Sequence, residues 1–195
     1  MSNCAGIKYS DLKWCDGKVN LPGIRPEVYC VAKRDIVQWP TLASSITTTM
    51  GEIATYTGSF VLAASAVFQQ IGVIDFRSGV NSEPQGTRPS KSFLTTGTFV
   101  YAGVDENATG FARQANNDDL VYAFRQKDGK FRIIGNEMYQ TDTAVSQSLG
   151  SQPTDEMGTT LTVTVTDVCP APFYTGEIVT IDGTINPAPE PPVQG

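Results

Sequence analysis

Residues 120–134 read LVYAFRQKDGKFRII and residues 158–166 read GTTLTVTVT. In the first stretch, two β-rich runs flank Asp128-Gly129, and Asp-Gly between such runs is the strongest short signal for a β-hairpin. In the second stretch, threonines alternate with apolar residues, which is the period of a strand that buries one face. The two stretches predict a β framework that the rest of the chain extends.

The threonines of the second stretch form one row on the outward face of the predicted strand. The row consists of Thr160, Thr162, Thr164 and Thr166, and it carries no charge. Such a surface suits solvent, packing against a neighbouring subunit, or the lining of a water-filled channel. We therefore treat these four residues as a candidate lumen or interface face.

The composition indicates an all-β protein. The chain has 195 residues, of which 40% are hydrophobic and 17% charged, against roughly 25% charged residues in typical soluble domains. Threonine, serine, glycine and β-branched residues dominate, as in β-sandwiches and β-barrels. A surface poor in charge is often partly a subunit interface.

Charge is distributed unevenly along the chain. Residues 1–100 contain 9 basic and 7 acidic side chains, and residues 101–195 contain 5 and 13, so that the halves carry +2 and −8 of the total −6. An acidic half argues against a conventional nucleic-acid grip, which needs clustered lysine and arginine. It also permits complementary contacts between different surfaces of neighbouring copies.

No arrangement of residues predicts catalysis, a cofactor or a metal site. Histidine is absent, which removes the usual general base and the commonest metal ligand. The four cysteines show no CxxC spacing and are interpreted as free thiols. Adjacent acids occur at Asp105-Glu106, Asp118-Asp119 and Asp155-Glu156, where we expect solvated turns.

The ends of the chain differ from its middle. Residues 1–27 are interrupted by glycine and proline but hold Tyr9, Leu12 and Trp14, which predicts an arm that closes its own domain or reaches a neighbour. Residues 28–184 are expected to form a single β domain, and residues 185–195 a proline-rich tail. No signal peptide or membrane-spanning run is recognisable, so we expect assembly in a reducing cytoplasm without a membrane partner.

The remaining pattern predicts strands and one short helix. Residues 59–68 keep a period of two despite their alanines and are predicted as a strand. Residues 107–117 are the best helix candidate, with Asn107 or Thr109 as the cap. Residues 135–151 are expected to be a connection with some strand character at 137–140.

Residues 77–92 are predicted to form a long irregular loop between strands, because they contain two glycines and two prolines. Loops of this length are uncommon and usually functional or disordered. We interpret the segment as an intersubunit contact, against an ordinary mobile loop or an enzyme lid. Its candidate contact residues are Arg77, Val80, Glu83, Arg88 and Lys91.

The layout as a whole resembles the major tail protein, the tube-forming subunit of long-tailed bacteriophages. The resemblance covers most of the chain and rests on its arrangement. It depends on the arm, the 77–92 segment, the 127–130 turn, Gly135, and the runs IVQWP at 36–40, GSFVL at 58–62, DEMGTTLTVT at 155–164 and PAPF at 170–173.

This resemblance implies a β-sandwich or barrel with one flanking helix and no enzymatic activity. Subunits of that family form homo-oligomeric rings whose sheets join into a β-lined channel, and the rings stack through loops and arms. DNA passes down the channel without specific binding, and other virion tail proteins are partners. Residues 77–92 would then be the ring-stacking loop.

Two other functions fit the same residues. A capsid decoration or connector protein would share this composition and its lack of catalytic groups. A carbohydrate-binding adhesive β-sandwich would need exposed aromatic residues, for which Trp14, Trp39 and the tyrosines are available but scattered in sequence. A hydrolase is the weakest alternative.

Overall fold

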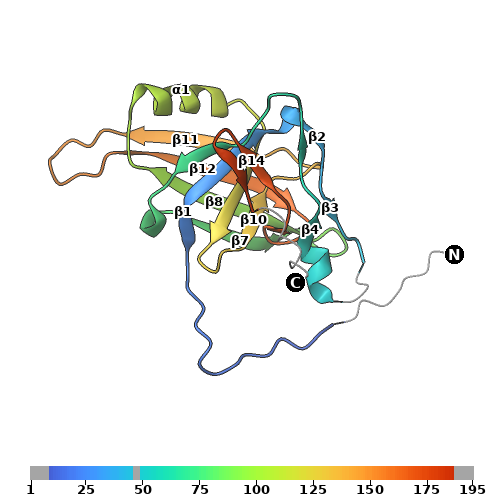
Figure 1. The fold of residues 1–195 in the computed structure, drawn as a ribbon. Helices are drawn as coiled ribbons and strands as arrows, with labels where there is room; N and C mark the ends of the chain where they lie inside the picture. Colours follow the sequence, from blue (N-terminus) through green and yellow to red (C-terminus); the bar gives the residue numbers. More distant parts are fainter. Residues whose placement is uncertain (1–8, 46–48, 187–195) are drawn as a thin grey trace, which may run out of the picture.

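The computed structural model describes residues 9–45 and 49–186, which form a mainly β structure with a single α-helix (Figure 1). Short 3-10 helices interrupt the chain at Lys33–Asp35, Met50–Ala54 and Asp75–Arg77. The other elements, in chain order, are β1 (Ile24–Ala32), β2 (Ile36–Gln38), β3 (Thr41–Leu42), β4 (Thr55–Thr57), β5 (Val61–Leu62), β6 (Gln69–Gly72), β7 (Gly79–Gln85), β8 (Ser92–Tyr101), α1 (Glu106–Ala115), β9 (Leu120–Gln126), β10 (Phe131–Ile134), β11 (Asp142–Ser148), β12 (Gly158–Asp167), β13 (Phe173–Tyr174), β14 (Ile178–Thr180) and β15 (Gly183–Ile185).

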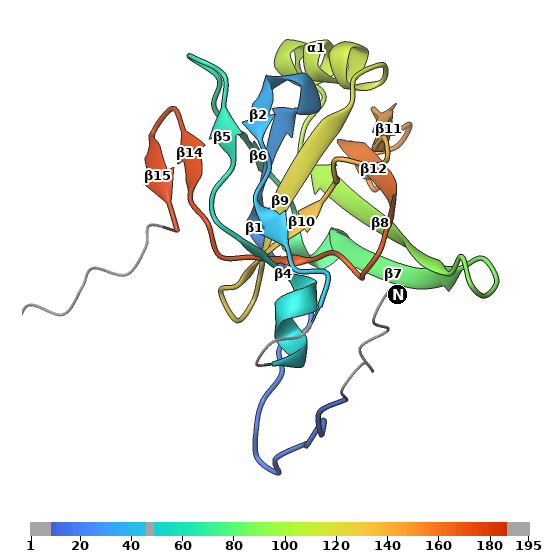
Figure 2. The same cartoon turned by 90° about the vertical axis from the view of Figure 1, so that its right-hand side faces the viewer.

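The strands form a sandwich with an additional layer. A seven-stranded sheet has the order β3-β4-β13-β10-β9-β1-β6, and a four-stranded sheet has the order β11-β12-β8-β7. Neighbouring strands are antiparallel except β13 and β4, which are parallel. Figure 2 shows the four-stranded sheet on one side of the seven-stranded sheet and the pairs β14-β15 and β2-β5 on the other.

The first core fills the space between the two large sheets. β9 and β1 contribute Tyr122, Phe124 and Val28, and β8 and β12 contribute residues that include Phe99 and Val163, all at most 2% exposed. The hydroxyls of Tyr122 and Thr143 form a buried hydrogen bond of 3.0 Å, which joins the seven-stranded sheet to β11. Apolar burial on this scale is the main stabilising contribution to the fold.

The second core lies on the opposite face of the seven-stranded sheet. It contains Tyr29 and Ile133 of that sheet, packed with Phe60, Phe68 and further residues under the β14-β15 pair. The hydroxyl of Tyr174 accepts a hydrogen bond from the Phe60 N–H at 3.1 Å and donates to the Glu177 carbonyl at 2.7 Å. The covering segments are therefore fixed by polar contacts as well as by apolar packing.

The hairpin and the threonine strand predicted from sequence are confirmed. β9 and β10 are antiparallel neighbours, and Gly129 between them adopts a φ of +95°, which glycine reaches without steric cost. In β12, Leu161, Val163 and Val165 are buried in the first core. The intervening threonines face outward and are partly exposed.

The predicted helix is present, but its cap differs. α1 begins at Glu106, and the Asp105 carboxylate accepts a hydrogen bond from the Ala108 N–H at 2.7 Å. Neither Asn107 nor Thr109 is the cap, since both lie inside the helix. Aspartate is as good an N-cap as asparagine, so the helix is capped two residues earlier than at the first predicted cap.

The prediction of a long irregular loop at residues 77–92 is wrong. Gly79–Gln85 is strand β7, which pairs with β8 over its whole length, and only residues 86–91 form a turn. Of the candidate contact residues, Val80 packs against the first core. The strand escapes recognition because its outward residues are polar and Pro84 interrupts its pattern.

Two further predictions need correction. Residues 59–68 are not a continuous strand, because only Val61–Leu62 is extended and Ser65 turns the chain with a φ of 70°. The strand in the 135–151 connection is β11 at Asp142–Ser148 rather than at residues 137–140.

The ends of the described chain lie outside the sandwich. Residues 9–23 are exposed and contain no strand or helix, and β1 begins at Ile24, inside the range assigned to the arm. Residues 1–8 of the arm, and residues 187–195 of the proline-rich tail, lie outside the described residues.

Replacing Gly97 with alanine tests the packing between the two large sheets. A Cβ atom at Gly97 would lie 2.7 Å from Cδ1 of Ile134 and 3.0 Å from the Phe99 ring. We expect Gly97→Ala to lower the free energy of unfolding in urea by about 1–3 kcal/mol. Gly79→Ala, in the same sheet with nothing within 4 Å of its Cβ, is the control and should change it by less than about 0.5 kcal/mol. Equal effects of the two substitutions would contradict this packing.

Asp105 makes the stability of α1 depend on pH. The hydrogen bond from the Ala108 N–H and then that from the Tyr101 hydroxyl hold the pKa of Asp105 below its usual value of 3.8. A carboxylate with a lowered pKa stabilises the folded state above its unfolded pKa, and this contribution is lost as the pH falls through the folded pKa.

We therefore expect Asp105→Ala to be less stable than the wild type at pH 7, by a difference that shrinks below pH 3.8 in thermal melts. Asp105→Asn keeps a capping oxygen, so it should retain more of the stability at pH 7. A difference between wild type and Asp105→Ala that is independent of pH would argue against the carboxylate cap.

Candidate functional site

The outer surface of the four-stranded sheet is the most extended candidate site. Register places sixteen residues that are at least partly exposed on this surface, which we call the threonine face; Val100 and Gly158 share the surface but are buried. The sixteen are Gly79, Asn81, Glu83 and Gln85 of β7, Ser92, Leu94, Thr96 and Thr98 of β8, Thr160, Thr162, Thr164 and Thr166 of β12, and Asp142, Ala144, Ser146 and Ser148 of β11.

The charges on the threonine face are all acidic. Glu83 and Asp142 are exposed near its two edges, and none of the sixteen residues is lysine or arginine. Between them lies a band of hydroxyls, partly ordered by Gln85, whose Nε2 donates to Oγ1 of Thr166 at 2.9 Å. The face is therefore hydrophilic and offers no cation to bind a phosphate.

Both edges of the four-stranded sheet lack a strand neighbour among the described residues. β7 and β11 are the outermost strands, and each has seven residues. α1 runs close to β11 at the top of Figure 1, where the Thr109 hydroxyl donates to Oε1 of Gln147 at 3.3 Å. Unpaired strand edges present backbone donors and acceptors that can pair with another chain.

The candidate residues of the 77–92 segment do not form one site. Arg77 is paired with Glu156 at 2.7 Å, and Val80 faces the core. Glu83 lies on the threonine face, while Arg88 and Lys91 are exposed in the turn between β7 and β8. The threonine row of β12, in contrast, lies beside Thr96 and Thr98 of β8 on one surface.

Sequence reasoning missed most of the threonine face. Thr96 and Thr98 lie directly beside Thr164 and Thr162, and Asp142 lies on the other side of Thr164. The alternation of β8 could have indicated its outward threonines, but only the strand register brings them next to β12.

The adjacent acids have structural partners. Asp105 caps α1, and Asp118 and Asp119 form ion pairs with Arg34 and Lys33. The Asp155 carboxylate accepts hydrogen bonds from the N–H groups of residues 151 and 152. Among residues 9–45 and 49–186, no group of three or more acidic or cysteine side chains is arranged to hold a metal ion.

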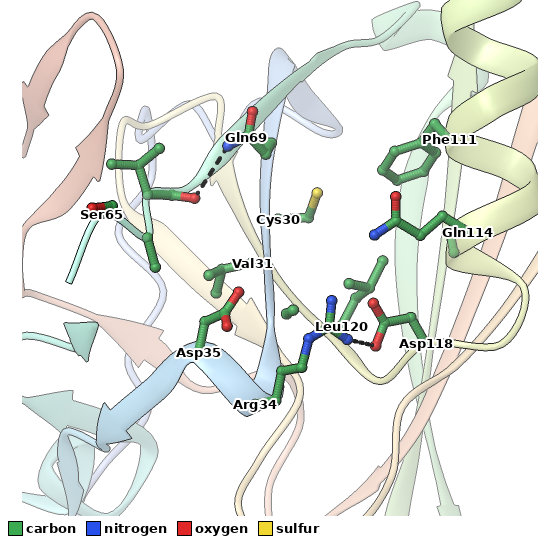
Figure 3. A pocket seen from close by; sticks show the side chains of 14 residues that line it. Cys30, Val31, Arg34, Asp35, Ser65, Gln69, Phe111, Gln114, Asp118 and Leu120 are labelled. Carbon is green, nitrogen blue, oxygen red and sulfur yellow. Dashed lines mark hydrogen bonds and ion pairs between the residues drawn. The ribbon is translucent and has the colours of Figure 1, made fainter. Parts of the chain in front are cut away.

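A pocket between α1 and the end of β1 is a second candidate (Figure 3). Cys30 lies in its wall, and Phe111 and Gln114 of α1 stand opposite. Burial raises the pKa of Cys30 to about 12, so the thiol is protonated at neutral pH and is a poor nucleophile. The guanidinium of Arg34 is paired with Asp118, so the pocket contains no unpaired arginine.

No helix in the described part of the chain is long and apolar enough to cross a membrane. Comparison with protein-family models, with curated proteins and with solved structures finds no match to this chain.

The cysteines should differ in reactivity. Cys15 is exposed, whereas burial raises the pKa of Cys30 to about 12 and that of Cys169 to about 11. Among these three cysteines, at pH 8 we expect iodoacetamide to modify Cys15 first and Cys30 only after unfolding in urea, as located by peptide mass spectrometry. Cys15→Ser is the control for assignment, and modification of native Cys30 as fast as Cys15 would show that the pocket wall opens.

Proposed function

We propose that this chain is a non-enzymatic virion protein that self-associates into stacked rings and forms a bacteriophage tail tube through which DNA passes. The observation that carries the proposal is the four-stranded sheet, which combines a broad face of hydroxyls and acids with two edges that lack a strand neighbour among the described residues, the β11 edge being flanked by α1. An open sheet favours joining with further copies, and such a face favours passage of a polyanion without adhesion.

The two edges support ring formation. Because β7 and β11 lie at opposite edges of one sheet, pairing β7 of one copy with β11 of the next is a head-to-tail contact. Contacts of this type close into a ring when the rotation between copies permits it. Strands of seven residues span about 23 Å, so that backbone hydrogen bonds could join the sheets along a substantial length.

The threonine face would line the lumen of such a ring. DNA binding depends on lysine and arginine neutralising phosphates, and the face has neither. Glu83 and Asp142 add negative charge, which repels the phosphate backbone and is focused inside a narrow channel. Threonine hydroxyls keep the surface hydrated between these charges.

The arm supports contact with other copies. Residues 9–23 expose five large apolar side chains, which are uncommon on a solvated segment. They are Tyr9, Leu12, Trp14, Val19 and Leu21. In a stack of rings, this arm and the turn that carries Arg88 and Lys91 would contact the adjacent ring.

Negative-stain electron microscopy across a range of concentrations tests the proposal. Wild-type protein should form rings or hollow tubes. Asn81→Lys/Ser146→Lys places a positive charge on each edge strand, so we expect it to need at least about tenfold more protein to assemble, because like charges oppose pairing. Circular dichroism would show that this variant retains the wild-type fold.

Thr96→Lys/Thr160→Lys is the matched control, since it adds the same charge at the same level of the sheet, on the two central strands. It should still assemble, and its tubes should retain double-stranded DNA in a salt-dependent manner that the wild type lacks. Isolated wild-type particles at every concentration, or equal assembly by the edge variant, would refute this arrangement.

A further inference from the structure

A groove away from the threonine face lies where β3 and β4 meet the chain that follows β12. Its apolar lining includes Trp39, Leu42, Ile53 and Met138, and Asp167 is among its polar residues. We call it the Asp167 groove. Asp167 ends the inward-facing row of β12, so its side chain points away from the threonine face.

Asp167 is a buried acid whose carboxylate is only partly hydrogen-bonded. The residue is 2% exposed, and its Oδ1 accepts a hydrogen bond from the Val168 N–H at 2.6 Å. Its Oδ2 is buried without a hydrogen-bond partner in the part of the chain that the structure describes. The amide of Asn136 lies near this carboxylate, but its Nδ2 donates to the Thr166 carbonyl at 2.8 Å. A buried polar atom left unpaired costs free energy, so such atoms call for a functional or structural explanation.

The surroundings of Asp167 favour a positive partner. Glu137 also lines the groove, and no lysine or arginine of residues 9–45 and 49–186 does. The pKa of Tyr56, another lining residue, is raised first by burial and then by the negative charge of Asp167. Arg132, which lies near Cys169, is already held by the carbonyls of residues 170 and 171.

We propose that the Asp167 groove binds a primary ammonium group carried on an apolar stem. The ammonium donates to Oδ2 of Asp167, and the stem lies along Trp39 and Met138. A charge-assisted hydrogen bond of this kind satisfies the unpaired oxygen and compensates the burial of its charge.

The geometry selects an ammonium over a guanidinium. Oδ2 has no hydrogen-bond partner among the described residues, whereas Oδ1 is already engaged by the Val168 N–H. A guanidinium binds a carboxylate best with two parallel hydrogen bonds, whereas an ammonium is a compact point donor. Met138, which also lines the groove, is 66% exposed and has an unbranched side chain that rotates readily.

Binding in the Asp167 groove does not require tube formation. The same chemistry could be supplied by a free alkylamine or by a lysine side chain of a protein. A lysine offers a four-carbon stem that can pack on apolar surface while its charge pairs with an acid.

The test is a titration of the full chain labelled with 13C at the methionine methyl groups, followed by NMR. The probes are pentylammonium, its neutral analogue 1-pentanol, and Nα-acetyl-lysine N-methylamide, and Met138→Leu assigns the Met138 signal. We expect pentylammonium to shift that signal and to bind at least about tenfold more tightly than 1-pentanol. Tighter binding of the lysine amide would indicate a protein side chain as the source, and binding of pentylammonium alone would indicate a small amine.

Asp167→Asn removes the charge with little change in shape and should weaken pentylammonium binding at least about tenfold. Asp142→Asn, an exposed acid on the threonine face, is the matched control and should bind as the wild type does. Equal binding of pentanol and pentylammonium, equal binding by Asp167→Asn, or no shift with any probe would each overturn the proposal.

Discussion

The structure depends on a central sheet that buries both of its faces. In β9, every residue from Leu120 to Phe124 is buried, with alternate side chains entering the two cores. β1 behaves in the same way around Tyr29 and Cys30. A sheet of this kind needs a cover on each side, because either face would otherwise expose a continuous apolar surface. The four-stranded sheet provides one cover, and the short strands and turns between Ile36 and Phe68, with those after Phe173, provide the other.

This division explains which elements could be predicted from the sequence. The β9-β10 hairpin and β12 were recognisable because their side chains follow the apolar content or the alternation that burial requires. β7 and β11 were not, since GVNSEPQ and DTAVSQS contain few apolar residues. Both are edge strands with one face on solvent, so tertiary pairing rather than apolar pattern determines them. For residues 59–68 the apolar pattern predicted a continuous strand that is not there. Phe60 and Phe68 are buried as a strand would bury them, but the chain turns between them.

The candidate site was predictable in part for the same reason. The outward threonines of β12 follow from its period of two, whereas their neighbours on β8, β7 and β11 follow only from strand register. Asp167 could not be distinguished from other acids in the sequence. Its burial arises because it continues the inward row of Leu161, Val163 and Val165 one step beyond the apolar part of the strand. One strand thus supplies hydroxyls to the outer surface and a carboxylate to the interior.

The alternation in β12 also restricts where the chain can change length. One residue inserted within the strand would move the valines onto the outer face and the threonines into the core. β8 is subject to the same restriction, since Phe99 and Thr98 occupy opposite faces. Insertions and deletions are therefore tolerable at the ends of the sheet, in the turns at residues 86–91 and 149–157. Insertions in these two turns would extend the molecule at the ends of the sheet and leave the dimensions of the threonine face unchanged.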